Sequence, residues 1–316
     1  MNKKIQIWLP LFISIGVVAG MLIGYKLRDT QPGKNFFSFE KLSPLQEIMN
    51  LIKNKYVDEV KINALSDSAI ATVLQKLDPH SVFIPADDLQ SVNEEIAGNF
   101  FGIGIEFNIY ADTLQVLNVI PDGPSYKAGI RIGDKFIKVN DSVIAGKKVT
   151  SDQVRKLLRG DLGTKAIVTL LRNGKLQTLA IVRGIIPVSS IDASYIIENG
   201  IGYIKLNKFS QVSYREFMKA LEGLQKKGLK KLILDLRGNG GGVLDEATAI
   251  ADEFLDGDKL ITYTEGAHIT RREYRCQRAG LFEKGELVVL ADEGSASASE
   301  VLMGALQDWD RATIIG

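Results

Sequence analysis

A run of glycines directly after an apolar strand constrains the fold of this chain more than any other feature. Residues 231–237 have the pattern of a buried strand, and residues 238–242 then place four glycines in five positions. The same order returns where the apolar stretch 287–291 precedes the small residues of 294–300 and a helical pattern. Strands that alternate with helices are typical of an α/β fold, whose ligand sites gather at the carboxyl ends of the strands. We therefore expect an α/β domain over residues 188–316.

Serine alternates with alanine in the second loop, at residues 295–299. A turn from a strand into a helix exposes backbone amides and the positive end of the helix dipole. A serine at such a turn can attack a carbonyl carbon while neighbouring amides stabilise the oxyanion. Ser297 has the smallest neighbours and is the candidate nucleophile, whereas Ser299 is expected to cap the helix, with Glu300 near its positive end. The alternative is that these serines do no more than cap a helix.

The glycine loop at 238–242 does not match a phosphate-binding loop. No Gly-Lys-Ser/Thr follows it, and its glycines lack the dinucleotide-binding spacing. We interpret it as a source of backbone N–H groups, one of which would form an oxyanion hole together with the amide of Ala298. Asp235 and Arg237 are expected to brace the loop rather than to react.

The composition excludes several classes of partner. With 39 basic and 38 acidic residues the net charge is +1, which leaves no basic excess for a nucleic acid. The single cysteine, Cys276, excludes a disulfide within the chain. Two histidines and one cysteine that lie well apart offer no metal-ligand cluster, so we expect neither a metal nor another cofactor.

The first 28 residues are expected to form a membrane anchor. Lys3 and Lys4 precede residues 5–24, a stretch of 20 residues without formal charge, which is close to the length that spans a bilayer. A cleaved signal peptide is the alternative, because residues 18–20 are small enough for a signal peptidase. Either interpretation places the rest of the chain in the cell envelope, on the periplasmic side of the cytoplasmic membrane.

Residues 29–98 are expected to form a linker and a helical arm. A linker over 29–41 precedes apolar residues at helical spacing in 45–52, a second helix over 63–77 and a third from Pro85. We interpret this region as an arm or a dimer element, so a homodimer is among the expected partners. His80 lies in a proline turn between two of these helices, where a structural role is expected.

Between residues 99 and 187 the pattern changes to short strands. Glycine-spaced residues 102–107 are followed by a turn at 121–129, a second turn at 132–134, an amphipathic helix over 151–158 and a hairpin at Asn173-Gly174. This order resembles a PDZ domain. The alternative is a plain β-domain with a tight turn.

The resemblance to a PDZ domain implies a binding site for protein tails. An extended peptide would pair with the open strand edge beside Ile105 and Phe107. Its C-terminal carboxylate would meet backbone amides, and the helix would contribute apolar side chains. The implied peptide-binding residues are Gly102, Ile103, Gly104, Ile105, Val154 and Leu158.

Residues 234–242, 294–300 and 305–308 together resemble the carboxyl-terminal processing, or tail-specific, serine proteases. The resemblance implies a crotonase/ClpP-like α/β protease core in which Ser297 is the nucleophile and a lysine is the general base. It also implies an oxyanion hole built from the amides of Ala298 and of Gly240 or Gly241, and a supporting role for Asp308. The implied substrates are exported proteins with free C-terminal tails.

The sequence departs from this family in one respect. The family's lysine lies in a Phe-Gly-Lys-Gly segment after the strand that matches residues 312–316, and the sequence contains no such segment. We therefore expect the base to lie outside these 316 residues. A catalytically inactive PDZ protein that only binds tails is the alternative, and His268 is a second candidate base. A more remote alternative function is a non-proteolytic enzyme on a crotonase-like core.

Overall fold

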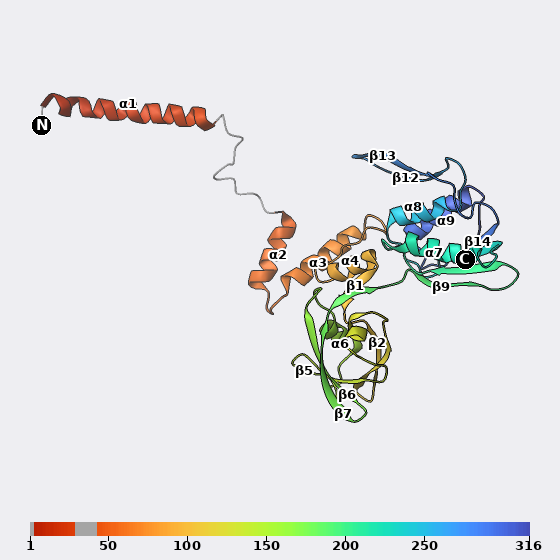
Figure 1. The fold of residues 1–316 in the computed structure, drawn as a ribbon. Helices are drawn as coiled ribbons and strands as arrows, with labels where there is room; N and C mark the ends of the chain where they lie inside the picture. Colours follow the sequence, from red (N-terminus) through yellow and green to blue (C-terminus); the bar gives the residue numbers. More distant parts are fainter. Residues whose placement is uncertain (1–2, 29–42) are drawn as a thin grey trace. The chain divides into compact units, whose positions relative to one another are not determined.

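The computed structural model describes residues 3–28 and 43–316, and the chain forms two compact units, 1–78 and 79–316. The first unit contains helices α1 (Lys3–Arg28), α2 (Pro44–Lys55) and α3 (Ile62–Leu74) (Figure 1). A capping box of Ser43 and Gln46 starts α2. Among the residues that the structure describes, neither α2 nor α3 has a fully buried one, although both have half-buried residues. The expected linker at 29–41 lies outside the described residues.

The expected membrane anchor is not supported. The segment does form a helix, but the bounds of α1 include Lys3 and Lys4 at one end and Lys26 and Arg28 at the other. Crossing a bilayer requires about 20 consecutive apolar residues, and helical length alone does not meet that requirement. Among the described residues, no helix has both the length and the apolar character to span a membrane.

The second unit opens with α4 (Leu89–Ala97), which ends at Gly98 in the left-handed conformation, with a φ of 68°. The helix expected from Pro85 therefore starts later, because residues 85–88 form a turn before it. Strand β1 (Asn99–Gly102) pairs antiparallel with β8 (Gly184–Pro187). These two strands enter and leave the PDZ-like region.

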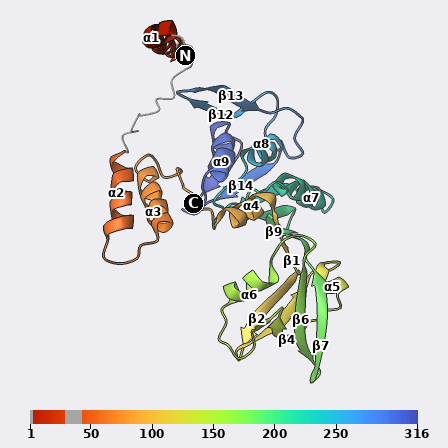
Figure 2. The ribbon, with the colours of Figure 1, turned by 90° about the vertical axis from the view of Figure 1, so that its left-hand side faces the viewer.

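A sheet ordered β2-β3-β4-β6-β7, with β5 paired to β4, forms the PDZ-like region (Figure 2). Its hairpin turn has positive φ at both central residues, 50° at Asn173 and 75° at Gly174, as the Asn-Gly signal predicts. Strand β2 stands at the end of the order, so one of its edges is open. The elements are β2 (Ile105–Tyr110), β3 (Thr113–Val119), α5 (Pro124–Lys127), β4 (Lys135–Val139), β5 (Ser142–Val143), α6 (Ser151–Leu158), β6 (Lys165–Arg172) and β7 (Lys175–Val182).

The rest of the unit contains an antiparallel pair, β12 and β13, and a five-stranded sheet ordered β15-β14-β11-β10-β9, in which only β9 is antiparallel to its neighbour. Helices α7, α8 and α9 lie on one side of it (Figure 1), where the buried strand residues pack against their apolar faces. The α/β prediction is confirmed. The elements are β9 (Ile191–Ile196), β10 (Ile201–Leu206), α7 (Ser213–Gln225), β11 (Lys231–Asp235), α8 (Leu244–Asp252), β12 (Leu260–Gly266), β13 (Ile269–Arg275), β14 (Glu286–Leu290), α9 (Ala298–Asp308) and β15 (Thr313–Ile315).

Strands β11 and β14 are parallel neighbours in which Asp235 lies opposite Leu290. They therefore end at the same edge of the sheet. The glycine loop and the serine turn both leave from this edge, and this register brings two segments about 60 positions apart in the sequence to one place.

Candidate active site

The glycine loop and the serine turn are joined by hydrogen bonds. The amide of Gly238 donates to Asp292 Oδ1 at 2.7 Å. The carbonyl of Asn239 accepts from the amide of Ala296 at 3.1 Å and from Ser299 Oγ at 2.8 Å. Asn239 is itself buried, and its side-chain amide donates to the carbonyl of Leu206. The two loops therefore form one connected structure.

Gly241 shows how closely the two loops approach. A Cβ placed on Gly241 would lie 2.6 Å from the carbonyl oxygen of Ala296, 2.8 Å from Ser297 Cβ and 2.9 Å from the amide nitrogen of Ala298. Its φ of 97° is also one that L side chains rarely adopt. Only glycine fits this position, because the nearest atoms belong largely to the backbone and cannot move aside.

The three serines of the turn have different roles. Ser295 Oγ donates to the carbonyl of Leu236 at 2.8 Å, and Ser299 Oγ donates to the carbonyl of Asn239. Ser299 is fully buried inside α9, so the expectation that it caps the helix is wrong; the capping position is held by Ser297. Ser297 is exposed, and it is the serine of this turn that lines a cleft.

The backbone of Ser297 is strained. Its φ of 56° and ψ of −112° lie outside the regions that non-glycine residues normally occupy. Such a conformation costs about 1–3 kcal/mol and persists only where the surroundings enforce it. The N–H of Ser297 donates to Glu300 Oε2, and its carbonyl accepts the amide of Val301 at 3.0 Å. Both bonds hold the residue at the start of α9.

The cleft beside Ser297 has a volume of about 600 Å³. Asp308 lies at the other end of α9, 11 residues from Ser297, a rise of about 16 Å along the helix, so the two residues line opposite ends of the cleft. The cleft is lined by His80, Gly242, Leu244, Ile261, Thr262, Ser297, Ala298, Glu300, Val301, Gly304, Ala305 and Asp308.

The amides expected to form an oxyanion hole differ in their availability. Ala298 is the first residue of α9, and among the described residues its N–H donates no hydrogen bond, as is usual in a first helical turn. The amide of Gly240 is likewise without an acceptor in residues 43–316. The amide of Gly241 instead donates to Asn239 Oδ1 at 2.9 Å. Of the loop glycines, Gly242 lines the cleft.

Asp235 braces the base of the glycine loop. Its carboxylate is 1% exposed and accepts hydrogen bonds from Tyr203 Oη at 2.7 Å and from the Arg237 guanidinium at 2.6 Å, while Lys205 Nζ lies 3.3 Å away. Burial by itself would raise the pKa of Asp235, but the bonds from Arg237, Tyr203 and Lys205 outweigh it and hold the pKa well below its ordinary value. This geometry agrees with the expected bracing role.

The histidines are placed differently from the expectation. His268 lies at the turn of the β12–β13 hairpin and is not among the residues that line the cleft. His80 does line the cleft, with Nε2 3.9 Å from Glu300 Oε2. No local pattern predicts the contact between residues 80 and 300, because it depends on how the segment before α4 folds back.

Two bracing residues, Asn239 and Asp292, were missed by the sequence reasoning. Asp292 accepts from the amides of Gly238 and Gly294, which lowers its pKa. The available signal was their position: a short polar residue after the end of a parallel strand often accepts hydrogen bonds from nearby backbone amides.

Of the residues expected to bind a peptide tail, Gly102 to Ile105 lead into β2, whose edge is open, while the side chain of Ile103 is buried in the core. Gly102 ends β1 and Ile105 starts β2; in the described part of the chain the amides of Ile103 and Gly104 between them donate no hydrogen bond. Val154 and Leu158 are buried in the core of this region, so neither presents an open surface. The half-buried Phe107 and Leu157 pack against the same core and are the more accessible apolar side chains.

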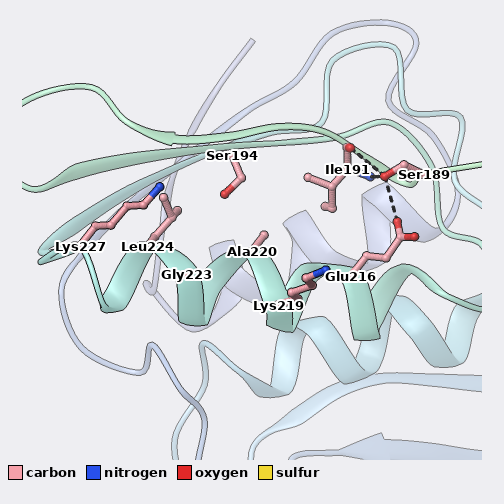
Figure 3. Close-up of a pocket in the computed structure, with 9 residues that line it drawn as sticks. All are labelled: Ser189, Ile191, Ser194, Glu216, Lys219, Ala220, Gly223, Leu224 and Lys227. Atoms are coloured by element: carbon pink, nitrogen blue, oxygen red, sulfur yellow. Dashed lines mark hydrogen bonds between the residues drawn. The ribbon is translucent and has the colours of Figure 1, made fainter. Parts of the chain in front are cut away.

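A second cleft, of about 340 Å³, lies between α7 and β9 (Figure 3). Glu216 points toward Ser189 and accepts from its hydroxyl at 3.1 Å. None of the residues expected to act in catalysis lines this cleft, so it is distinct from the cleft beside Ser297.

Comparison with known proteins identifies both regions. The peptidase family S41 matches residues 200–316, and the PDZ domain matches residues 102–182. The carboxy-terminal-processing protease of Bartonella bacilliformis is 33% identical over 285 residues, which cover 88% of this chain and 65% of that protein. A probable CtpA-like serine protease of Staphylococcus aureus is 34% identical over 304 residues, or 96% of this chain and 60% of that protein.

Among solved structures, a photosystem II D1 C-terminal processing protease is 27% identical, with coverage of 85% of this chain and 73% of that chain and a TM-score of 0.41. The chain spans less than two thirds of the length of the two relatives named above. With an S41 region and a PDZ region in one chain and relatives that match along most of it, the chain belongs to the family of PDZ-containing carboxyl-terminal processing proteases.

Proposed function

We propose that the chain is the core of a serine endopeptidase that cleaves proteins selected by their C-terminal tails. The observation that carries the proposal is the sorting of the three serines. Ser295 and Ser299 donate their hydroxyls to the carbonyls of Leu236 and Asn239, whereas Ser297 lies exposed on the cleft at the start of α9. A strained serine beside a helix N-terminus is a common arrangement for a nucleophile.

In the proposed reaction, Ser297 Oγ attacks the scissile carbonyl carbon and loses its proton to a general base. The negative charge that develops on the carbonyl oxygen is stabilised by the Ala298 amide and by an amide of the glycine loop. Gly240 is the better second donor, because the Gly241 amide would first have to leave Asn239. Asp308 would support the substrate-binding end of the cleft rather than contact Ser297.

The proposed base is the lysine of the family's Phe-Gly-Lys-Gly segment, which is not part of the sequence printed above. A lysine acts as a base at neutral pH when burial lowers its pKa. His80 is the competing candidate, since it lines the same cleft. Replacement of His80 by Gln separates the two: a variant that cleaves at the parent rate supports lysine, and one that is inactive supports histidine.

The proposed route of substrate selection is strand addition at the open edge of β2, with the tail carboxylate at the amides of Ile103 and Gly104. Exported proteins are the expected substrates. The periplasmic location and the homodimer stay predictions.

The test is Ser297→Ala, assayed on an unstructured protein with an apolar C-terminal tail, in the protein expressed to the end of its reading frame. We expect cleavage to fall at least about 1,000-fold. Ser295→Ala is the matched control and should keep turnover while lowering stability. A Ser297→Ala variant that cleaves as fast as the parent would refute the nucleophile.

The alternative is a protein that binds tails without cleaving them. It predicts saturable binding of a peptide with a free carboxylate and no cleavage by the parent. The codons after Gly316 separate the two functions as well, since a Phe-Gly-Lys-Gly segment favours the enzyme.

A further inference from the structure

Glu300 occupies the third position of α9, and its carboxylate turns back to the residue before the helix. Oε2 accepts the backbone N–H of Ser297 at 2.5 Å and also lies 3.9 Å from His80 Nε2. The Glu300 side chain is 53% exposed and lines the cleft with Ser297. It is therefore not held in place by burial.

The N–H that Glu300 accepts belongs to the peptide plane between Ala296 and Ser297. On either side of this plane the chain is fixed, because the Ala296 amide and Ser299 Oγ both donate to the carbonyl of Asn239. The carbonyl of the same plane, that of Ala296, accepts the amide of Ser299 at 3.1 Å, so Ser299 and Glu300 hold its two polar groups. Without the Glu300 acceptor the N–H side of the plane loses its partner, and a rotation that relaxes the positive φ of Ser297 would move its Cβ, and the hydroxyl with it.

A carboxylate at this position also carries an electrostatic disadvantage for the proposed reaction. It stands near the Ala298 amide, where an oxyanion would develop, and like charges repel. The interaction with the helix dipole is favourable but is available to any acid in the first turn. The specific feature of Glu300 is its reach back to the Ser297 N–H.

We propose that Glu300 is a positioning residue that holds the Ser297 backbone in the conformation required for attack. The inference rests on the proposed function and assigns no proton transfer to Glu300. It differs from helix capping alone, because capping predicts an effect on stability and none on turnover.

Three variants of the same position test the proposal. Glu300→Gln keeps an oxygen that can accept the Ser297 N–H and should hold kcat within about threefold of the parent. Glu300→Ala removes the acceptor and should lower kcat about 10- to 100-fold with KM within about twofold, as expected for a misplaced reacting group. Glu300→Asp keeps the charge but shortens the reach, and should lose turnover like the alanine variant.

Glu293→Ala is the matched control. Glu293 is an exposed acid of the same loop, and in the described part of the chain its side chain makes no ion pair or hydrogen bond. The turnover of Glu293→Ala should equal that of the parent. Thermal unfolding of every variant identifies any that fails to fold; if Glu300→Ala does so, the comparison of Glu300→Asp with Glu300→Gln decides.

The proposal is overturned if Glu300→Ala and Glu300→Asp turn over at the parent rate, or if Glu300→Gln is as impaired as Glu300→Ala, which would mark the carboxylate as a base. Ser297→Ala in the same assay keeps the two proposals apart. Activity that survives Ser297→Ala refutes the proposed function, whereas activity lost there but unchanged at position 300 refutes only the positioning role.

Discussion

The chain contains two glycine-bearing loops that present backbone amides, and they are built differently. In the PDZ-like region, Gly104 has a φ of 75°, and a Cβ there would lie 2.9 Å from Ile186 Cδ1, the end of a flexible side chain. In the α/β core, a Cβ on Gly241 would meet the carbonyl oxygen of Ala296 and the amide nitrogen of Ala298. An added atom in the first loop would meet a side chain, whereas in the second loop it would meet backbone.

The comparison shows that the neighbour of a glycine decides how strictly the glycine is required. The loop at 102–105 faces an open strand edge, which fits a site that must admit a peptide. The loop at 238–242 faces another backbone, which fits a site that must hold two segments at a constant distance. Three substitutions test this difference.

Gly241→Ala should have the largest effect. The added Cβ has to displace the serine turn, and the positive φ is unfavourable for alanine. We therefore expect the free energy of unfolding to fall by about 2–4 kcal/mol and the activity to be lost. Urea unfolding measures it. Gly240→Ala is the control, because a Cβ at that position meets no atom within 4 Å, and it should cost less than about 1 kcal/mol. Equal losses in the two variants would contradict the close approach of the loops.

Asp235→Asn should have the next largest effect, because it removes the brace beneath the core loop. The Arg237 guanidinium would then face a neutral amide instead of a carboxylate. We expect the free energy of unfolding to fall by about 2–4 kcal/mol at neutral pH. The folded-state pKa of Asp235 lies below its unfolded value of about 3.9. The carboxylate therefore contributes fully to the stability of the fold above about pH 3.9, and this contribution is lost as the pH falls through the folded pKa.

The difference in stability between parent and Asp235→Asn should therefore shrink below about pH 4. Urea unfolding at pH 7, 5 and 3 measures this trend. A difference that stays constant over the three values would show that the charge of Asp235 is not what braces the loop.

Gly104→Ala should have the smallest effect on stability, about 1 kcal/mol, because the positive φ is unfavourable for alanine but the added Cβ meets the end of a side chain rather than backbone. Tail binding should weaken up to about tenfold, because the added methyl narrows the approach to the amides of the loop. Fluorescence anisotropy with a labelled peptide measures the binding, and the same peptide with an amidated C-terminus is the control. Binding that depends on the free carboxylate but is unchanged in Gly104→Ala would place the carboxylate elsewhere.

Local sequence signals predicted the elements whose structure depends on near neighbours. Asn173-Gly174 forms the expected turn, and the amphipathic helix expected over 151–158 forms α6 over Ser151–Leu158. Strands β1 and β8 were missed because their pairing joins residues 99–102 to residues 184–187, across the whole PDZ-like region. Pairing between distant segments leaves little trace in a short window of sequence.

The same distinction holds at the candidate site. The sequence pointed to Ser297 through its small neighbours, and to the glycine loop through its place after a strand. The sequence did not show that Asn239 holds both sides of the serine, nor that His80 reaches the cleft. It also assigned helix capping to Ser299, which the structure buries against the glycine loop.

By itself, the sequence determined the class of the fold, the order of the two regions and the two loops in which chemistry was to be sought, because apolar periodicity and glycine placement are local properties. Only the tertiary structure decided which serine stays exposed and which amides stay unbonded. Those properties depend on the parallel register of β11 and β14, which sets the two loops side by side, and on the contacts through which Ser295 and Ser299 donate their hydroxyls to the carbonyls of Leu236 and Asn239.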